Sequence, residues 1–230
     1  MVKAAPSPRA LARARGRLER QLLADGLLVA GVDEVGRGCL AGPVYAASAI
    51  LDFAKVKRLK KAQRDLLRDS KQLSHAQRAA MVPVIRDVCL DWQVASASVE
   101  EIDEIGILQA CFLAMRRCLG VCGVPFDLLL VDGKLPVAGY AGRQQTVVKG
   151  DSLCFSIAAA SILAKETRDE HMREQAGVFP GYGFEQHVGY GTAQHLAKIA
   201  KHGVCRLHRR SFEPIRERLE RSRGEAGAPA

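Results

Sequence analysis

Two apolar runs that each end in a carboxylate constrain the fold of this chain more than any other feature. Residues 29–34 read VAGVDE and residues 128–133 read LLLVDG. Short apolar runs of this kind predict strands, and in α/β sheets the ends of strands gather ligands and catalytic groups at one edge. We therefore expect Asp33 and Asp132 to meet at such an edge, together with Asp151, which follows a further short strand.

The other segments predict strands first and then alternating helices and strands. Strands are expected at residues 27–33, 44–51, 92–99, 126–132 and 145–149. Helices are expected after the capping box of Ser74 and Gln77, over residues 100–119 and 152–175, and over 192–202, where Gly203 ends the helix. Pro83 should kink or split the first of these helices. This order predicts an α/β layered fold with a mixed sheet.

A length of 230 residues predicts one domain with two tails. We place a basic N-terminal extension at 1–25, the domain at 26–223 and a flexible C-terminal tail at 224–230. The N-terminal extension is a flexible arm or a charged helix, and its Arg-rich composition superficially resembles a transit peptide. A solvated basic extension is the interpretation we favour.

Charge and cysteine usage narrow the class of protein. Lys and Arg exceed Asp and Glu by 34 to 25, so the net charge is +9, which suits a nucleic-acid-binding protein or a merely soluble basic one. The seven Cys include no CxxC pair, which argues against a zinc ribbon and a disulfide scaffold. Reduced thiols predict a cytoplasmic protein, and no apolar run is long enough to span a bilayer.

The acids at the strand ends predict a metal site. Carboxylates brought together repel one another, and a hard divalent cation relieves the repulsion. Oxygen ligands favour Mg²⁺ or Mn²⁺ over Zn²⁺, and two such ions can cleave a phosphodiester. The alternative is that each Asp only caps the next turn. Because Asp33 and Glu34 are neighbours, they point to opposite faces of a strand, and both reach one site only where the strand ends or twists.

A glycine-rich turn follows the acidic pair. Gly36 and Gly38 allow the backbone to approach a phosphate or sugar closely, and Arg37 offers a forked donor. A plain tight turn is the alternative.

These residues resemble the N-terminal signature of the type 2 ribonucleases H, specifically the bacterial ribonuclease HII family. Further blocks agree in order over about residues 28–215. They are GVDEVGRG (31–38), LAGPV (40–44), DSK (69–71), VDG (131–133), KGDS (149–152), AAASILAK (158–165), TRD (167–169), residues 187–192 and HRRSF (208–212).

The resemblance implies a ribonuclease H-like fold, with a five-stranded mixed sheet flanked by helices and a helical C-terminal portion. It implies hydrolysis of the RNA strand of RNA–DNA hybrids and cleavage at single ribonucleotides in duplex DNA, leaving 5′-phosphate and 3′-hydroxyl ends. Rival interpretations are a non-catalytic nucleic-acid-binding protein and a nuclease that acts on DNA alone. We expect a monomer.

The resemblance also implies the roles of single residues. The four catalytic carboxylates fall on Asp33, Glu34, Asp132 and Asp151; the first three would hold Mn²⁺ or Mg²⁺, and Asp151 would complete the site. The turn of Gly36, Arg37 and Gly38 would read the ribose 2′-hydroxyl, Tyr190 would stack on the following deoxyribose, and Lys71 would touch a backbone phosphate.

For three other charged residues, the sequence leaves two roles open. Asp169 either forms a salt bridge with Arg168 or Arg173 or supports the site. Arg209 and Arg210 either hold phosphate or form surface salt bridges.

Overall fold

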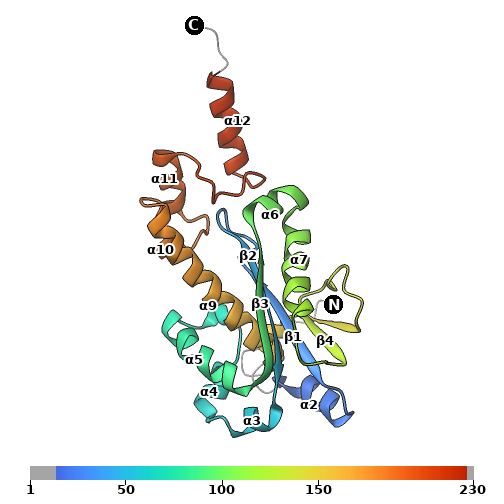
Figure 1. Cartoon of the computed structure of the whole chain (residues 1–230). Helices are drawn as coiled ribbons and strands as arrows, with labels where there is room; N and C mark the ends of the chain where they lie inside the picture. The colour runs from blue at the N-terminus through green and yellow to red at the C-terminus, as the bar shows by residue number, and fades with distance from the viewer. Residues whose placement is uncertain (1–13, 227–230) are drawn as a thin grey trace, which may run out of the picture.

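The structure is a computed structural model that describes residues 14–226, with side chains through residue 222. Its centre is a five-stranded sheet in the order β3-β2-β1-β4-β5 (Figure 1). β1 is antiparallel to β2 and parallel to β4, so the sheet is mixed as predicted. The strands are β1 (Val29–Val35), β2 (Val44–Leu51), β3 (Cys89–Ala97), β4 (Leu128–Asp132) and β5 (Gln144–Val147).

Helices cover both faces of the sheet. The helices are α2 (Arg17–Ala24), α3 (Phe53–Arg58), α4 (Lys61–Leu66), α5 (His75–Val88), α6 (Val99–Ile105), α7 (Ile107–Gly120), α8 (Gly150–Leu153), α9 (Phe155–Val178), α10 (Phe184–His187), α11 (Ala193–His202) and α12 (Ile215–Ala226), with a 3-10 turn η1 (Ser70–Gln72). α7 packs on one face through a core that includes Val32 and Val131, and α5 and α9 pack on the other through Ala47 and Ala49. Figure 1 shows α2, α3 and α4 at one end of the molecule and α10 to α12 at the other.

The sheet and α9 approach each other closely at Gly31 of β1. A Cβ atom at this position would overlap the backbone of Ser156 and Ile157 in the first turn of α9. The absence of a side chain therefore lets the helix lie directly on the strand.

The strand predictions are confirmed. Two of the segments predicted as single helices are each two helices. The helix expected over 100–119 is two helices, because Gly106 takes a φ of 78° that no α-helix continues through. The helix expected over 152–175 is α8 followed by α9, with extended backbone at Cys154. Pro83 does not split α5. The carbonyl that it leaves unpaired belongs to Ala79, which is exposed and therefore open to water.

The two ends of the described chain are helical. The helix alternative for the basic N-terminal extension holds over α2, whose Glu19 is fully buried and accepts hydrogen bonds from the backbone N–H groups of Phe155 and Ser156, each at 2.8 Å. Burial raises the pKa of Glu19. α12 continues through Ala226, inside the predicted tail. Residues 1–13 and 227–230 lie outside the described residues, and none of the described helices is both long and apolar enough to cross a membrane.

The close approach at Gly31 gives a stability prediction. Gly31→Ala should lower the free energy of unfolding by about 3 kcal/mol, because the new methyl group can be accommodated only if backbone moves. Gly177→Ala, near the end of α9 and with no atom near its Cβ position, is the matched control; it should be neutral or stabilising by about 0.5–1 kcal/mol. Urea unfolding of both variants measures the difference, and equal stabilities would contradict the close packing.

Candidate active site

Three carboxylates meet at the carboxyl ends of β1 and β4. The parallel register pairs Val32 with Val131, so Asp33 and Asp132 occupy the next positions on the two strands. Asp33 is only 5% exposed. The backbone N–H of Asp151, at the start of α8, donates to Oδ1 of Asp132 at 3.3 Å. The sheet edge therefore gathers the acids as the sequence predicted.

Glu34 reaches the same region from the other face of β1. β1 continues to Val35, so Glu34 points away from Asp33, toward α7. Its carboxylate lies 3.9 Å from the Arg37 guanidinium. Glu34, Asp132 and Arg37 line a cavity of about 190 Å³ beside α7. The four acids therefore surround the end of β1, with Glu34 on one side and Asp33 on the other.

Burial, and after it the charges of neighbouring acids, raises the pKa of Asp33, Glu34 and Asp151. Burial raises the pKa of Asp33 well above its usual range, and the charges of Asp132, Glu34 and Asp151 raise it further. Burial and the charge of Asp132 raise the pKa of Asp151 to about 6. Burial also raises the pKa of Glu34, although Arg37 opposes the shift. The site holds more negative charge than its own surroundings neutralise.

The donor chemistry of the site fits a hard divalent cation. All four candidate ligands are carboxylates, and Cys111, which also lines the cavity, stays a neutral thiol because burial raises its pKa to about 12. Oxygen ligands of this kind suit Mg²⁺ or Mn²⁺. Within residues 14–226, no three His, Cys, Asp or Glu side chains are arranged as a ready-made metal site.

Lys71 supplies positive charge next to the acids. It belongs to η1, where the Asp69 side chain accepts a hydrogen bond from the Lys71 backbone N–H. Burial lowers the pKa of Lys71, but the attraction of Asp33 and other nearby carboxylates outweighs this and raises it overall. The charges of Asp33, Asp151 and Asp132 therefore act on Lys71.

A buried arginine holds the glycine-rich turn. Arg209 has no exposed surface, and its guanidinium donates to the carbonyls of Gly36 at 2.7 Å, Arg37 at 3.0 Å and Gly42 at 2.9 Å. Burial lowers its pKa to about 10. Both alternatives for Arg209, phosphate binding and surface salt bridging, are therefore wrong. Arg210, its neighbour, is exposed.

A second buried arginine joins this turn to the segment that carries Tyr190. The Arg168 guanidinium is also fully buried and donates to the carbonyls of Ala41, Pro43 and Val188. A Cβ atom at Gly36, where φ is 88°, would overlap the Arg168 side chain. Glycine at this position therefore lets the turn lie directly on the arginine.

Tyr190 lies beside the glycine-rich turn. Its backbone forms a β-bridge with Cys39, the residue that follows Gly38. The Leu40 N–H donates to the Gly189 carbonyl at 2.8 Å, and the Lys165 ammonium lies 5.3 Å from the centre of the Tyr190 ring. The structure thus brings together the turn and the tyrosine, which are far apart in sequence.

Three buried histidines support the Tyr190 segment. His195 Nδ1 donates to the Tyr190 carbonyl at 2.9 Å, so its Nε2 must accept from His208 Nε2 at 3.1 Å. His208 Nδ1 in turn accepts from the Cys205 N–H. His187 accepts from the Gly189 N–H and donates to the Tyr182 carbonyl. The bonds in which a ring nitrogen of His195 or His208 accepts require a neutral imidazole.

Asp169 forms ion pairs with partners that the sequence analysis did not identify. It pairs with Arg78 at 3.2 Å and Lys165 at 2.7 Å, and not with Arg168 or Arg173. The sequence analysis missed Arg78 entirely and considered Arg168 only as a salt-bridge partner of Asp169. One signal in the sequence predicts that Arg168 is buried: it lies on the same helical face as Ile157, Ser161 and Ala164.

Comparisons with known proteins agree with this geometry. The family model of ribonuclease HII matches residues 30–215. Ribonuclease HII of Synechococcus sp. (strain CC9902) is 50% identical over 196 residues, which cover 85% of this chain and 96% of the relative. The chain belongs to the ribonuclease HII family. It is therefore a ribonuclease H, a hydrolase that acts on RNA–DNA hybrids, and its family depends on divalent metal ions.

Solved structures share the fold. The ribonuclease H2 of Pyrococcus horikoshii OT3 superposes with a TM-score of 0.69 at 26% identity, covering 85% of this chain and 98% of the other. Bst-RNase HIII in complex with Mn²⁺ superposes with a TM-score of 0.66 at 20% identity, covering 97% and 77%. The expected ribonuclease H-like fold is therefore confirmed.

The role of Arg209 can be tested through stability. Arg209→Lys keeps the charge but cannot reach three carbonyls with one ammonium, so the free energy of unfolding should fall by about 2 kcal/mol. The exposed neighbour gives the control: Arg210→Lys should change it by less than about 0.5 kcal/mol. If chemical denaturation found the two variants equally stable, the guanidinium contacts would not matter.

The histidine cluster predicts a loss of stability in acid. Burial lowers the pKa of His195 and His208 to about 4, whereas an unfolded His titrates near pH 6.5. The unfolded chain therefore binds protons that the folded chain excludes, and stability falls as the pH drops from about 6.5 toward 4. His195→Gln should flatten this dependence in urea unfolding, and His202→Gln, at an exposed position, should leave it unchanged. Identical pH profiles for all three proteins would contradict the prediction.

Proposed function

We propose that this ribonuclease H cleaves the RNA strand of hybrids and also cuts at single ribonucleotides embedded in duplex DNA. One observation carries the proposal: a cluster of buried carboxylates lies next to a rigid glycine-rich turn. The carboxylates suit phosphodiester hydrolysis, and the turn suits recognition of a ribose. The products would carry 5′-phosphate and 3′-hydroxyl ends.

Together, the carboxylates would bind two divalent cations. Asp33, Glu34 and Asp132 would ligate Mn²⁺ or Mg²⁺, and Asp151 would complete the site. When bound, the ions supply the charge that activates a water and stabilises the leaving oxygen. Burial and then the charges of neighbouring acids raise the pKa of Asp33 and Asp151; the repulsion among the acids supports this role, because a bound cation relieves it.

Recognition of the ribose would come from the backbone of the turn. The 2′-hydroxyl both donates and accepts hydrogen bonds, and the peptide groups of Gly36, Arg37 and Gly38 offer both kinds of partner. Arg209 uses the carbonyls of Gly36 and Arg37, so the turn is held before substrate arrives. Tyr190 would stack on the following deoxyribose, and Lys71 would contact a backbone phosphate.

We infer further that residues 26–223 form the catalytic domain and that the protein acts as a cytoplasmic monomer. All seven Cys are free thiols in the structure, which supports a reducing compartment.

The carboxylate role gives opposite predictions for activity and stability. Asp33→Asn should reduce cleavage of a duplex with one ribonucleotide by at least about 100-fold, because a metal ligand is removed. The same variant should raise the melting temperature without divalent ions, since it removes a buried charge that its neighbours repel. Asp132→Asn should also lose cleavage.

Asp25→Asn, at an exposed acid at the end of α2, is the control and should cut normally. Wild-type cleavage by Asp33→Asn would reject the assignment. Binding of the duplex in Mn²⁺ without cleavage by the native protein would favour a non-catalytic binding protein, and cleavage of an all-DNA duplex would favour a DNA nuclease.

A further inference from the structure

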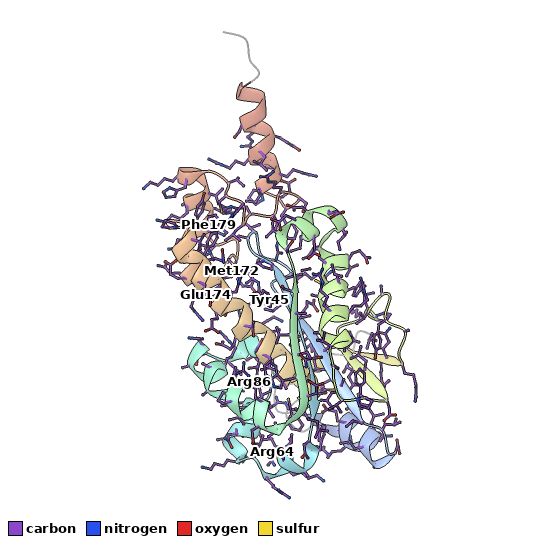
Figure 2. All side chains as sticks on the ribbon, viewed as in Figure 1. Tyr45, Arg64, Arg86, Met172, Glu174 and Phe179 are labelled. Carbon is purple, nitrogen blue, oxygen red and sulfur yellow. The ribbon has the colours of Figure 1, made fainter. Side chains whose placement is uncertain are left out.

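A second charged cavity lies away from the carboxylates, among α2, α3 and α4. Its volume is about 300 Å³, and Arg15, Arg20, Lys57 and Arg64 line it together with Phe53 and Phe155. Arg64 is labelled in Figure 2, near the end of the molecule opposite α12. We call this cavity the basic pocket.

Among the described residues, Arg15, Arg20, Lys57 and Arg64 form no salt bridge, although the charge of Asp65 acts on Arg15 and Arg64. The hydrogen bonds of Arg15 Nε, Arg20 and Arg64 go to the backbone carbonyls of Ser152, Arg15 and Lys57. The acid in the lining is Asp65, and it already pairs with Lys61 at 2.7 Å. The pocket therefore carries an excess of positive charge.

Arg68, near Arg15, has a buried Nε–H group that forms no hydrogen bond within the described residues. Burial and the charge of Arg68 lower the pKa of Arg15, so the two guanidinium groups repel each other. A buried donor and clustered cations are both stabilised by an anion with several oxygens.

The remaining wall of the basic pocket is apolar. Phe53, Val56 and Phe155 line it, and Phe155 and Val56 are buried. Aromatic faces beside guanidinium groups suit a phosphate that is attached to a sugar or base, whereas a metal ion or a simple cation would be repelled.

The basic pocket and the glycine-rich turn lie toward opposite ends of β1. α2 leads into the start of the strand, and the turn follows its last residue. A strand of seven residues is about 23 Å long. Along a duplex, that distance corresponds to roughly six or seven base pairs at about 3.4 Å each. Arg15 links the basic pocket to the candidate site, because its Nε donates to the carbonyl of Ser152, the residue after Asp151.

We propose that the basic pocket binds a backbone phosphate of the substrate duplex, on one flank of the cut and roughly six base pairs from the ribonucleotide. The proposal rests on the proposed function, because the turn fixes where the ribonucleotide lies. If it holds, the arginines and the lysine of the basic pocket contribute to duplex affinity through one identifiable phosphate.

The test measures binding without cleavage, by fluorescence anisotropy in EDTA. The probe is a DNA duplex of about 24 base pairs with one central ribonucleotide. Lys57→Ala/Arg64→Ala should bind about tenfold more weakly than wild type near 0.1 M salt, and the slope of log K against log salt should become shallower by about 0.9 for each phosphate that the variant no longer neutralises. Arg58→Ala/Lys60→Ala is the control, because these exposed residues remove the same charge from the same region and do not line the pocket.

Shortened duplexes locate the phosphate. Cutting one flank to about three base pairs should abolish the difference between wild type and the pocket variant, and cutting the other flank should preserve it. An equal loss of affinity in the control variant would overturn the proposal, as would a difference that survives both truncations.

Inorganic phosphate distinguishes a small-anion site. If calorimetry shows phosphate binding that the pocket variant loses while its duplex affinity stays at the wild-type value, the pocket binds a free anion and the proposal fails. A native protein that shows the pocket effect but cuts no ribonucleotide duplex would contradict the proposed function alone.

Discussion

The direct contact between β1 and the first turn of α9 determines where the reactive groups lie. Gly31 allows the helix to rest on the strand. From that position the Ser161 hydroxyl of α9 opposes the rise that burial causes in the pKa of Asp33, and Ile157 packs against Gly150, the residue before Asp151. One absent side chain thus fixes the distance between a strand and a helix, and the acids on both follow from it.

The carboxylates of the candidate site lower the stability of the folded protein. Buried carboxylates that face one another destabilise the fold whenever they are charged, and the protein keeps several of them together at the end of one sheet. The surroundings compensate in part: Ser161 opposes the rise in the pKa of Asp33, Arg37 opposes that of Glu34, and the ammonium of Lys71 is attracted by Asp33, Asp132 and Asp151. This partial compensation leaves the negative charge that a cation needs.

Sequence reasoning succeeded where a signal is local. The strands follow apolar runs, Ser74 and Gln77 form the predicted capping box, and the acids fall at strand ends because the chain alternates strand and helix. It failed where the decisive partner is distant in sequence. Arg209 looks like a surface residue until the carbonyls of Gly36 and Gly42, more than 160 positions away, are placed around it. The break at Gly106 was also missed, because apolar residues on both sides keep the spacing of a single helix.

The buried carboxylate of Glu19 has a consequence for where this domain begins. α9 has no side-chain cap of its own, and Glu19 satisfies its first two free amides from a helix that lies before residue 30, the start of the family match. The segment that the family model matches is thus shorter than the unit that folds. A chain trimmed to residues 30–215 would expose the positive end of α9, close to the carboxylates of the candidate site.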